Sequence, residues 1–462
     1  MRNIDRGTQL SEIDPQWAWQ PWEPTATERW ETERVTLLFR RAGFCAAEST
    51  IRDSVALDHA TVIDGFFDLD GPGRERLEAF ESESATILKA VRASGDANKL
   101  ATWWLHRMLH SPQPLVEKMT LFWHGHFATG AEKVIDGELM YQQNQSLRRY
   151  ALGDFKAMVH AISKDPAMLI YLDSVTNRKA RANENFAREL MELFCLGEGN
   201  YSEADVQELA RCFTGWEIRR RQFRFNTYQH DTGTKTLFGQ SVQSGEEAVD
   251  RVLAHDRLPF FITRKLFRFF VCDEPGPSDQ LLEPLAKKLA DDDLSIAGVV
   301  RTIVGSRLML SDWSMGRKVR SPVDMAIGLM RTLEATTNFN RLSDRLREVG
   351  QALFYPPNVK GWDGGRAWVN SSTLVGRANL VHQLIRDENT RFAGGDLESF
   401  SKTKWNGTAE GLVDWFSRYF LAVPLSDSRR KELLSAVAGK PDPRMSREAI
   451  SLIAASPQFH LA

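Results

Sequence analysis

The sequence has few cysteines and no long apolar run. Its 462 residues include only four cysteines, Cys45, Cys195, Cys212 and Cys272, which are too scattered for a zinc-binding CxxC pair or a disulfide framework. We therefore expect buried, reduced thiols. No segment approaches the roughly 18 uninterrupted apolar residues of a membrane-spanning helix, and the N-terminal segment lacks the apolar core of a secretory signal. These absences favour a cytoplasmic protein without a membrane span, with export on a partner protein as an alternative.

An excess of charge of either sign is also missing. Lysine and arginine total 59 and aspartate and glutamate 61, which gives a net charge of −2. Such a balance provides no general attraction to nucleic acid, and the short run 219–221 (RRR) is too isolated to indicate a nucleic-acid interface. The motifs of phosphate-binding loops, dinucleotide-binding folds, serine hydrolases, zinc proteases and EF-hands are all missing. The familiar nucleotide-dependent and serine-dependent mechanisms therefore have no support.

The chain does have apolar residues at helical spacing and many tryptophans. Apolar stripes at helical spacing recur along most of the sequence, and strand-like alternation occurs only at 216–240, with a turn-like segment near 226–235. We predict a mainly α, large multi-helix globular fold with a small β-hairpin insertion. The expected organisation is an N-terminal extension (1–29), a helical core (30–390) and a C-terminal helical appendage (391–462). Thirteen tryptophans and 26 phenylalanines indicate buried aromatic clusters or an aromatic-walled cleft.

The first candidate site is the segment Trp123-His124-Gly125-His126-Phe127. Two histidines separated by one residue are a common chelating pair when the backbone is extended, but they point nearly apart on a helix. Because glycine weakens a helix, we expect His124 to end it and His126 to lie in the turn after it. The alternative is a pair of hydrogen-bonded histidines at a helix C-terminus, where the helix dipole favours a cation.

The second candidate is the predicted helix over 183–196, which is expected to end at Gly197. Its polar face gathers Glu184, Arg188, Glu189 and Glu192. Glu189 and Glu192 are three residues apart, so both carboxylates can address one point. Alternatively, Glu184, Arg188 and Glu192 form a charge ladder on a solvated face.

Two further segments combine chemically active residues. His230 and Asp231 are adjacent near the presumed hairpin tip, where they provide a metal ligand with its orienting acceptor, a general base or ordinary turn chemistry. Lys235 lies in the same segment. The loop 350–372 is rich in glycine and tryptophan, which suits a pocket wall or a tightly packed loop.

Several long segments, taken in this order, resemble the family called domain of unknown function 1800 (DUF1800). The matching segments lie at 37–44 (LLFRRAGF), 117–129 (EKMTLFWHGHFAT), 168–174 (MLIYLDS), 183–216, 230–239 (HDTGTKTLFG), 318–331 (KVRSPVDMAIGLMR) and 358–379. The resemblance covers about 30–385. It implies no settled activity, but it implies a partner from a second uncharacterised family (DUF1501) and exported relatives. The chain departs from the family pattern at Cys195, where a small polar residue is more typical, and at Asp324, where many relatives have Glu.

Our first functional hypothesis is a metal-dependent enzyme with an aromatic-lined cleft. Its ligands would be His124, His126, His230 and one or more of Glu184, Glu189 and Glu192. Asp231 would orient an imidazole and Arg188 would neutralise a carboxylate or bind an anionic substrate. The substrate pocket would include Trp123, Lys235, Asn358, Trp362, Trp368 and Asn370.

Mixed imidazole and carboxylate ligation suits Fe, Mn or Zn. The aromatic content favours an oxidoreductase, and a metal-dependent hydrolase is the alternative. A second hypothesis is a non-catalytic binding or maturation partner of a DUF1501-type protein. In that case the polar helix would be an internal network that fixes the fold.

Overall fold

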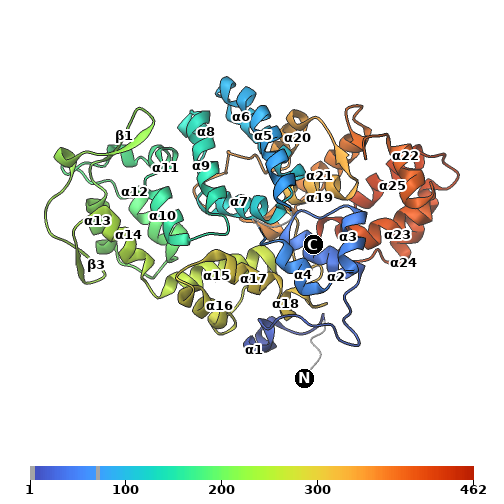
Figure 1. Ribbon diagram of the computed structural model, residues 1–462, viewed down its shortest axis with the longest axis horizontal. Helices are drawn as coiled ribbons and strands as arrows, with labels where there is room; N and C mark the ends of the chain where they lie inside the picture. Colours follow the sequence, from blue (N-terminus) through green and yellow to red (C-terminus); the bar gives the residue numbers. More distant parts are fainter. Residues whose placement is uncertain (1–5, 69–72) are drawn as a thin grey trace.

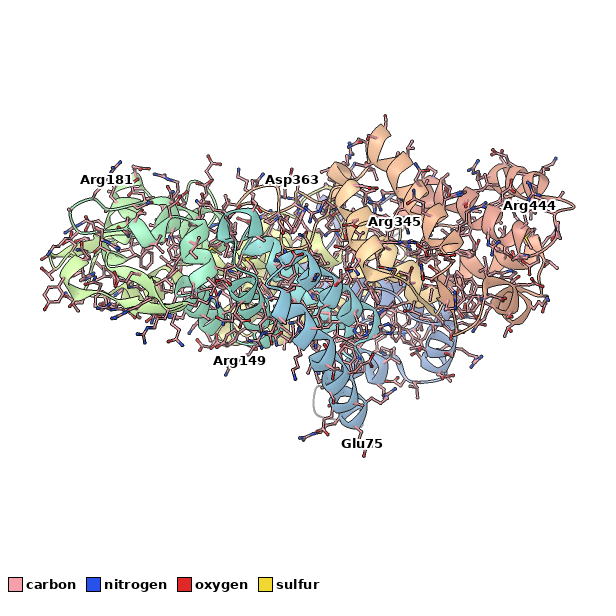
Figure 2. The ribbon with its side chains drawn as sticks, turned by 90° about the horizontal axis from the view of Figure 1, so that it is seen from above. Glu75, Arg149, Arg181, Arg345, Asp363 and Arg444 are labelled. Atoms are coloured by element: carbon pink, nitrogen blue, oxygen red, sulfur yellow. The ribbon has the colours of Figure 1, made fainter. Side chains whose placement is uncertain are left out.

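The fold is mainly helical, as expected. The computed structural model describes residues 6–68 and 73–462, and within these residues it contains 25 α-helices and three two-stranded antiparallel sheets. The molecule is elongated, with β1 and β3 at one end and helices α22 to α25 at the other (Figure 1). Figure 2 shows the same extension, with Arg181 and Arg444 at opposite ends and Asp363 between them.

The first third of the chain forms the centre of the molecule. Residues 1–5 of the expected N-terminal extension lie outside the described residues, and the remainder buries Trp19 and Trp22 in the core. Two helices follow α2 in quick succession, because Asp58 caps the second of them through the amides of Ala60 and Thr61. The helices of this part are α1 (Pro15–Ala18), α2 (Thr32–Ala42), α3 (Glu48–Val55), α4 (His59–Gly65), α5 (Arg74–Ser94), α6 (Ala97–His110), α7 (Pro114–His126), α8 (Ala131–Val134) and α9 (Gly137–Arg149).

The next helices include a distortion at one of the candidate sites. They are α10 (Phe155–Ser163), α11 (Pro166–Tyr171), α12 (Asn185–Glu189) and α13 (Glu203–Cys212). The polar helix expected over 183–196 is α12 continued by a π-helix, η3 (Leu190–Cys195). It ends before Gly197, whose φ of +83° is the left-handed conformation that closes many helices. Ser202 and Asp205 form the capping box that the sequence indicates for α13.

The predicted single hairpin over 216–240 is wrong in its pairing. Strand β1 (Trp216–Arg219) pairs with β2 (Gln222–Phe225), and β3 (Lys235–Leu237) pairs with β4 (Gln240–Val242). The first turn consists of Arg220 and Arg221, both with positive φ, as in the two-residue turns that match the twist of a hairpin. No glycine or asparagine marks this turn, so the turn-like segment after Phe225 is the stronger signal in the sequence.

The rest of the chain is helical apart from a third small sheet, β5 (Ala335–Thr336) with β6 (Arg391–Phe392). Helices α14 (Gly245–Leu253), α15 (Arg257–Phe270), α16 (Asp279–Asp291), α17 (Ile296–Val304) and α18 (Arg307–Leu310) contribute to the first of two hydrophobic cores. The remaining helices are α19 (Pro322–Thr332), α20 (Phe339–Glu348), α21 (Ser371–Arg386), α22 (Leu397–Trp405), α23 (Ala409–Tyr419), α24 (Asp427–Val437) and α25 (Arg444–Ala454). No helix in the described ranges is both long and apolar enough to cross a membrane.

The two hydrophobic cores meet at α7. The first contains Met119, Phe122 and Trp123 of α7 together with α10 to α18, and the second contains Leu121 of the same helix together with α6 and α19 to α25. Residues of the C-terminal segment 391–462, such as Trp405, belong to the second core along with residues of α6. Helix α7 is therefore held from both sides, and the end that carries the two histidines lies where the cores adjoin.

Candidate active-site cleft

The two histidines of α7 point in different directions. The helix does not end at His124 but continues through His126, where the amide of Phe127 donates to the carbonyl of Trp123 at 2.8 Å. A helical glycine costs only about 1 kcal/mol relative to alanine, and burial of α7 on both sides outweighs that cost. The expected placement of His126 in a turn is therefore wrong, and the two imidazoles have separate surroundings.

His124 is a buried hydrogen-bond acceptor. Its Nε2 accepts the backbone amide of Phe354 at 3.1 Å, and its ring packs against Trp104 and Trp362. Burial lowers the pKa of His124 to about 3, so the ring is neutral at any physiological pH. The histidine anchors the start of the loop that carries Trp362.

His126 is connected to a partly buried lysine. Its Nε2 lies 3.0 Å from the carbonyl oxygen of Phe194, and its Nδ1 lies 3.1 Å from Nζ of Lys265 on α15. Lys265 also donates to the carbonyl of Leu193 at 2.8 Å. Burial, with a smaller effect of Lys265, holds the pKa of His126 well below its usual value. Desolvation of the amine likewise lowers the pKa of Lys265 to about 7.

The π-helix explains why these carbonyls are available. Leu193 and Phe194 lie in the last turn of η3, where carbonyl groups have no partner within the helix. Lys265 and His126 satisfy them instead. Single π-helical turns occur often at functional sites, and here the turn presents two acceptors to one imidazole and one amine.

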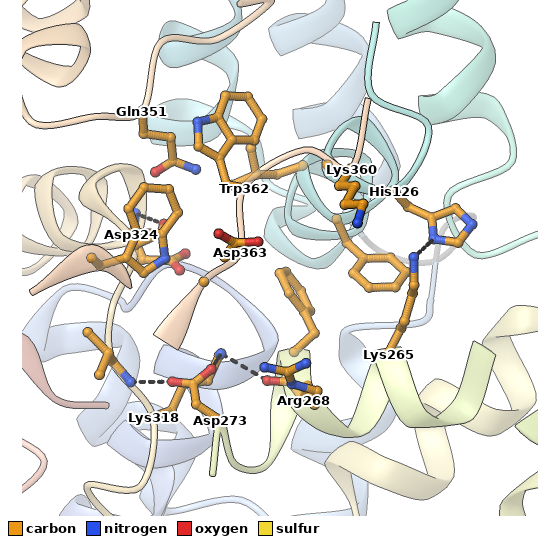
Figure 3. A pocket seen from close by; sticks show the side chains of 18 residues that line it. His126, Lys265, Arg268, Asp273, Lys318, Asp324, Gln351, Lys360, Trp362 and Asp363 are labelled. Carbon is orange, nitrogen blue, oxygen red and sulfur yellow. Dashed lines mark hydrogen bonds and ion pairs between the residues drawn. The ribbon is translucent and has the colours of Figure 1, made fainter. Parts of the chain in front are cut away.

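These groups lie at one end of a cleft of about 300 Å³ between α7, α15 and the 350–372 loop (Figure 3). Its walls include four aromatic side chains, Phe122, Phe269, Trp362 and Trp368. The charged groups that line it are Lys265, Arg268, Asp273, Lys318, Asp324, Lys360 and Asp363. The volume is at the lower end of that of small-molecule sites, and a few polar groups on apolar walls are typical of them.

At the other end of the cleft the cations have acidic partners. Lys318 donates to Asp273 at 2.8 Å, and the backbone amide of Val319 holds the second oxygen of the same carboxylate. Lys118, buried on α7, contacts Asp324 at 2.5 Å. Burial raises the pKa of Asp324, but the charge of Lys118 outweighs this and keeps the pKa below its usual value. These pairs form a fixed, charge-balanced floor.

The 350–372 loop approaches α7 closely because of glycine. Gly361 has a φ of +75°, and a Cβ at this position would lie 2.2 Å from the carbonyl oxygen of Gly125. Trp362 is held in place by a hydrogen bond from Nε1 to the carbonyl of Gly350 at 3.1 Å. The close approach requires glycine at position 361 and not at 125, where a Cβ would meet no atom within 4 Å. It brings Lys360 and Trp362 to the cleft.

Of the predicted pocket residues, Trp362 and Trp368 line this cleft together with His126. Trp123 is fully buried in the core and donates to the carbonyl of Ala151. Asn358 and Asn370 are exposed, and each stabilises its own backbone. Asn370 does so as the N-cap of α21.

The polar face of α12 and η3 resembles the charge ladder more than a single carboxylate cluster. Arg188 contacts Glu203 at 2.6 Å and Glu184 at 3.2 Å, and the bond to Glu203 is the main reason why its pKa is raised. Glu192 accepts the hydroxyl of Tyr201 at 2.9 Å.

Glu189 is the carboxylate of this face that interacts electrostatically with a residue of the cleft. Burial and then Glu192 raise its pKa, whereas Lys360 and Arg188 lower it. Because Lys360 lines the cleft, its effect on the pKa of Glu189 places this carboxylate within electrostatic range of the cleft.

The third predicted segment forms its own local structure. His230 Nδ1 lies 2.8 Å from the carbonyl of Thr214, and Asp231 contacts Arg211 at 2.8 Å. The hydrogen bond from Arg211 is the main cause of the lowered pKa of Asp231. Lys235 is buried and donates to the carbonyl of Gly233. His230, Asp231 and Lys235 are outside the lining of the cleft.

The six predicted metal ligands are not gathered in one place. Within residues 6–68 and 73–462, no group of three or more His, Cys, Asp or Glu side chains is arranged to hold a metal ion. A centre with Fe, Mn or Zn stays a prediction from the sequence. The four cysteines are buried and free, as expected.

Sequence reasoning missed the residues that give the cleft its charge: Lys265, Arg268, Asp273 and Lys318. Lys265 and Arg268 occur in 264–270 (RKLFRFF), where cations at helical spacing normally indicate a solvated face. Lys318 and Asp324 lie in 318–331, which the sequence connects only with a family resemblance. A sequence gives no signal that such a lysine is desolvated, because its surroundings depend on η3 and the distant loop.

One of the comparisons with known proteins identifies a family. The model of the family described as "Protein of unknown function (DUF1800)" matches residues 37–461. The match therefore includes the C-terminal helices, beyond the range of 30–385 that the motifs alone cover. No curated protein matches the chain. No solved structure matches it either. The chain thus belongs to the DUF1800 family.

Proposed function

We propose that the cleft is the functional centre of the protein and that it binds a small organic anion. The observation that carries this proposal is a pair of cations without an acidic partner. Arg268 on α15 and Lys360 on the loop both line the cleft, and neither forms an ion pair within the described part of the chain. Lys360 lies near Glu189 and favours its charged form, but it makes no direct contact with it.

The charge balance of the two ends supports the same proposal. Asp273 and Asp324 are neutralised by Lys318 and Lys118, so they contribute little net field to the cavity. The remaining carboxylate of the lining, Asp363, is outnumbered by Arg268 and Lys360. Arg268 and Lys360 are exposed, which leaves their charges available to a ligand. An anion that reaches both would form charge-assisted hydrogen bonds, which salt weakens because both cations are exposed.

The walls indicate what else the ligand carries. Phe122, Phe269, Trp362 and Trp368 present apolar surface around the charged groups. Burial of apolar ligand surface contributes about 25 cal/mol per Å². A carboxylate or phosphate with a short apolar or planar body fits this combination better than an inorganic ion.

Calorimetry with a panel of small aliphatic and aromatic carboxylates and phosphate monoesters tests the proposal. We expect at least one class to bind, with affinity that falls as salt is raised. Arg268→Gln and Lys360→Gln should each weaken that binding by about tenfold, which corresponds to about 1.4 kcal/mol. Lys89→Gln, which removes an exposed lysine of α5, should leave it unchanged. Equal binding by all three variants, or no binding by any anion, would overturn the proposal.

A further inference from the structure

The amine of Lys265 has an unusual set of hydrogen-bond partners. A backbone carbonyl can only accept, so His126 Nε2, 3.0 Å from the oxygen of Phe194, must carry the ring proton. In a neutral imidazole Nδ1 is then an acceptor, and it faces Nζ of Lys265 at 3.1 Å. The carbonyl of Leu193 is the second acceptor at 2.8 Å. Both partners of the amine are therefore neutral acceptors.

A neutral amine fits this arrangement fully. It has two N–H groups and one lone pair, and the two acceptors engage both N–H groups, which leaves the lone pair free. Within the described ranges no carboxylate forms an ion pair with Lys265, in contrast to Lys118 and Lys318. A desolvated amine without a counter-charge disfavours its charged form, so the contacts favour the free base. A desolvated lysine of this kind is a nucleophile for carbonyl groups.

The cleft brings a potential electrophile to this amine. Lys265 lines the same cavity as Arg268 and Lys360, and in Figure 3 its side chain extends from α15 toward His126 at one end of that cavity. An anion bound by the two unpaired cations would therefore lie in the same cavity as the amine. Confinement of reacting groups in one orientation is a major source of rate enhancement.

We propose that Lys265 forms an imine with the oxo group of a small organic anion, an aldehyde or 2-oxo acid, that is bound in this cleft. The inference rests on the proposed function and specifies its substrate class. The nitrogen lone pair forms a bond to the carbonyl carbon while the C=O π pair moves to oxygen. The two amine protons and that oxygen then leave as water, and a C=N bond remains. No oxidant or reductant takes part, and His126 acts as a positioning residue that orients one N–H.

Reductive trapping tests the imine directly. The full chain is treated briefly with a low concentration of glyoxylate and sodium cyanoborohydride, which converts an imine to a stable secondary amine, and the modified lysines are identified by peptide mass spectrometry. We expect Lys265 to be labelled at least tenfold faster than Lys360 in the same cleft or the exposed Lys89. Labelling of exposed lysines without preference for Lys265 would overturn the inference.

Two variants separate this inference from the proposed function. Lys265→Met removes the amine without adding a buried charge, so labelling at the site should disappear while binding of an anion without a carbonyl group, such as glycolate or a ligand found by calorimetry, is retained. Arg268→Gln should slow the labelling of Lys265 by about tenfold through weaker binding. Anion binding without labelling of Lys265 contradicts the imine alone. Rapid labelling that is indifferent to Arg268→Gln contradicts the anion site.

Discussion

The two ends of the cleft hold desolvated lysines in opposite ways. Lys118 on α7 is 3% exposed and contacts the carboxylate of Asp324, whereas Lys265 on α15 donates to an imidazole nitrogen and a carbonyl oxygen. A desolvated charge needs a partner of opposite charge, and without one the group shifts its pKa toward the neutral form. The ion pair of Lys118 and Asp324 therefore stabilises the fold. The amine of Lys265, which has no ion-pair partner in the described part of the chain, is available to react.

The largest effect should come from breaking the paired end. Asp324→Asn keeps the size of the side chain but leaves Lys118 buried without a counter-charge, which typically costs about 3–5 kcal/mol. Urea unfolding should show this loss of stability. Asp363→Asn is the matched control, because Asp363 lines the same cleft but is exposed, and it should stay within about 0.5 kcal/mol of the parent. Equal effects of the two substitutions would mean that the ion pair of Lys118 and Asp324 does not stabilise the fold.

A smaller loss is expected where the loop is held over the unpaired end. Gly361→Ala adds a methyl group 2.2 Å from the carbonyl oxygen of Gly125 at a φ of +75°, so the loop must shift or strain, at a cost of about 1–3 kcal/mol. Gly239→Ala, in the turn between β3 and β4, has a similar φ of +73° and meets no atom within 4 Å. The difference in melting temperature between the two variants isolates the contact with α7. Equal melting temperatures would mean that backbone strain accounts for the whole effect and that the contact with Gly125 contributes nothing.

Lys265 itself should show its effect in the pH dependence of stability. The pKa of Lys265 is about 7 in the folded chain and near 10.5 in the unfolded chain, so between these values the unfolded state binds more protons. Stability must then rise with pH across this window, by up to about 1.4 kcal/mol per pH unit. Lys265→Met should remove that contribution, which comparison of unfolding curves at about pH 7.5 and about pH 9.5 measures. An unchanged slope would show that the amine stays charged in the folded protein.

The metal hypothesis is tested by metal content and not by stability. Elemental analysis of the purified chain should find Fe, Mn or Zn in stoichiometric amount if it is correct, and both His124→Ala and Glu189→Ala should lose the metal. A metal-free parent protein would contradict the hypothesis. His59→Ala is a suitable control, because His59 lies outside the predicted ligands and packs against Trp22 and Trp30.

The features predicted most reliably from the sequence are local ones. The end of the 183–196 helix at Gly197 depends only on neighbouring residues, and the structure has it as expected. The turn at Arg220 and Arg221 was missed because arginine rarely adopts positive φ. The charge of the cleft was missed because it depends on tertiary contacts of segments that are far apart in sequence. Substrate class and a DUF1501-type partner stay predictions.

The π-helix η3 also places the backbone carbonyls that contact His126 and Lys265, so its geometry affects the chemistry of the amine. A π-helical turn contains one residue more than the α-helical turn it replaces, and this extra residue turns the carbonyls of Leu193 and Phe194 toward α15 and α7. Deleting one residue between 190 and 195 would restore regular α-helix and rotate the rest of that turn by about 100°. Lys265 would then lose an acceptor without any change to its own side chain. The length of the chain at η3, and not only the residue types in the cleft, sets the state of the amine.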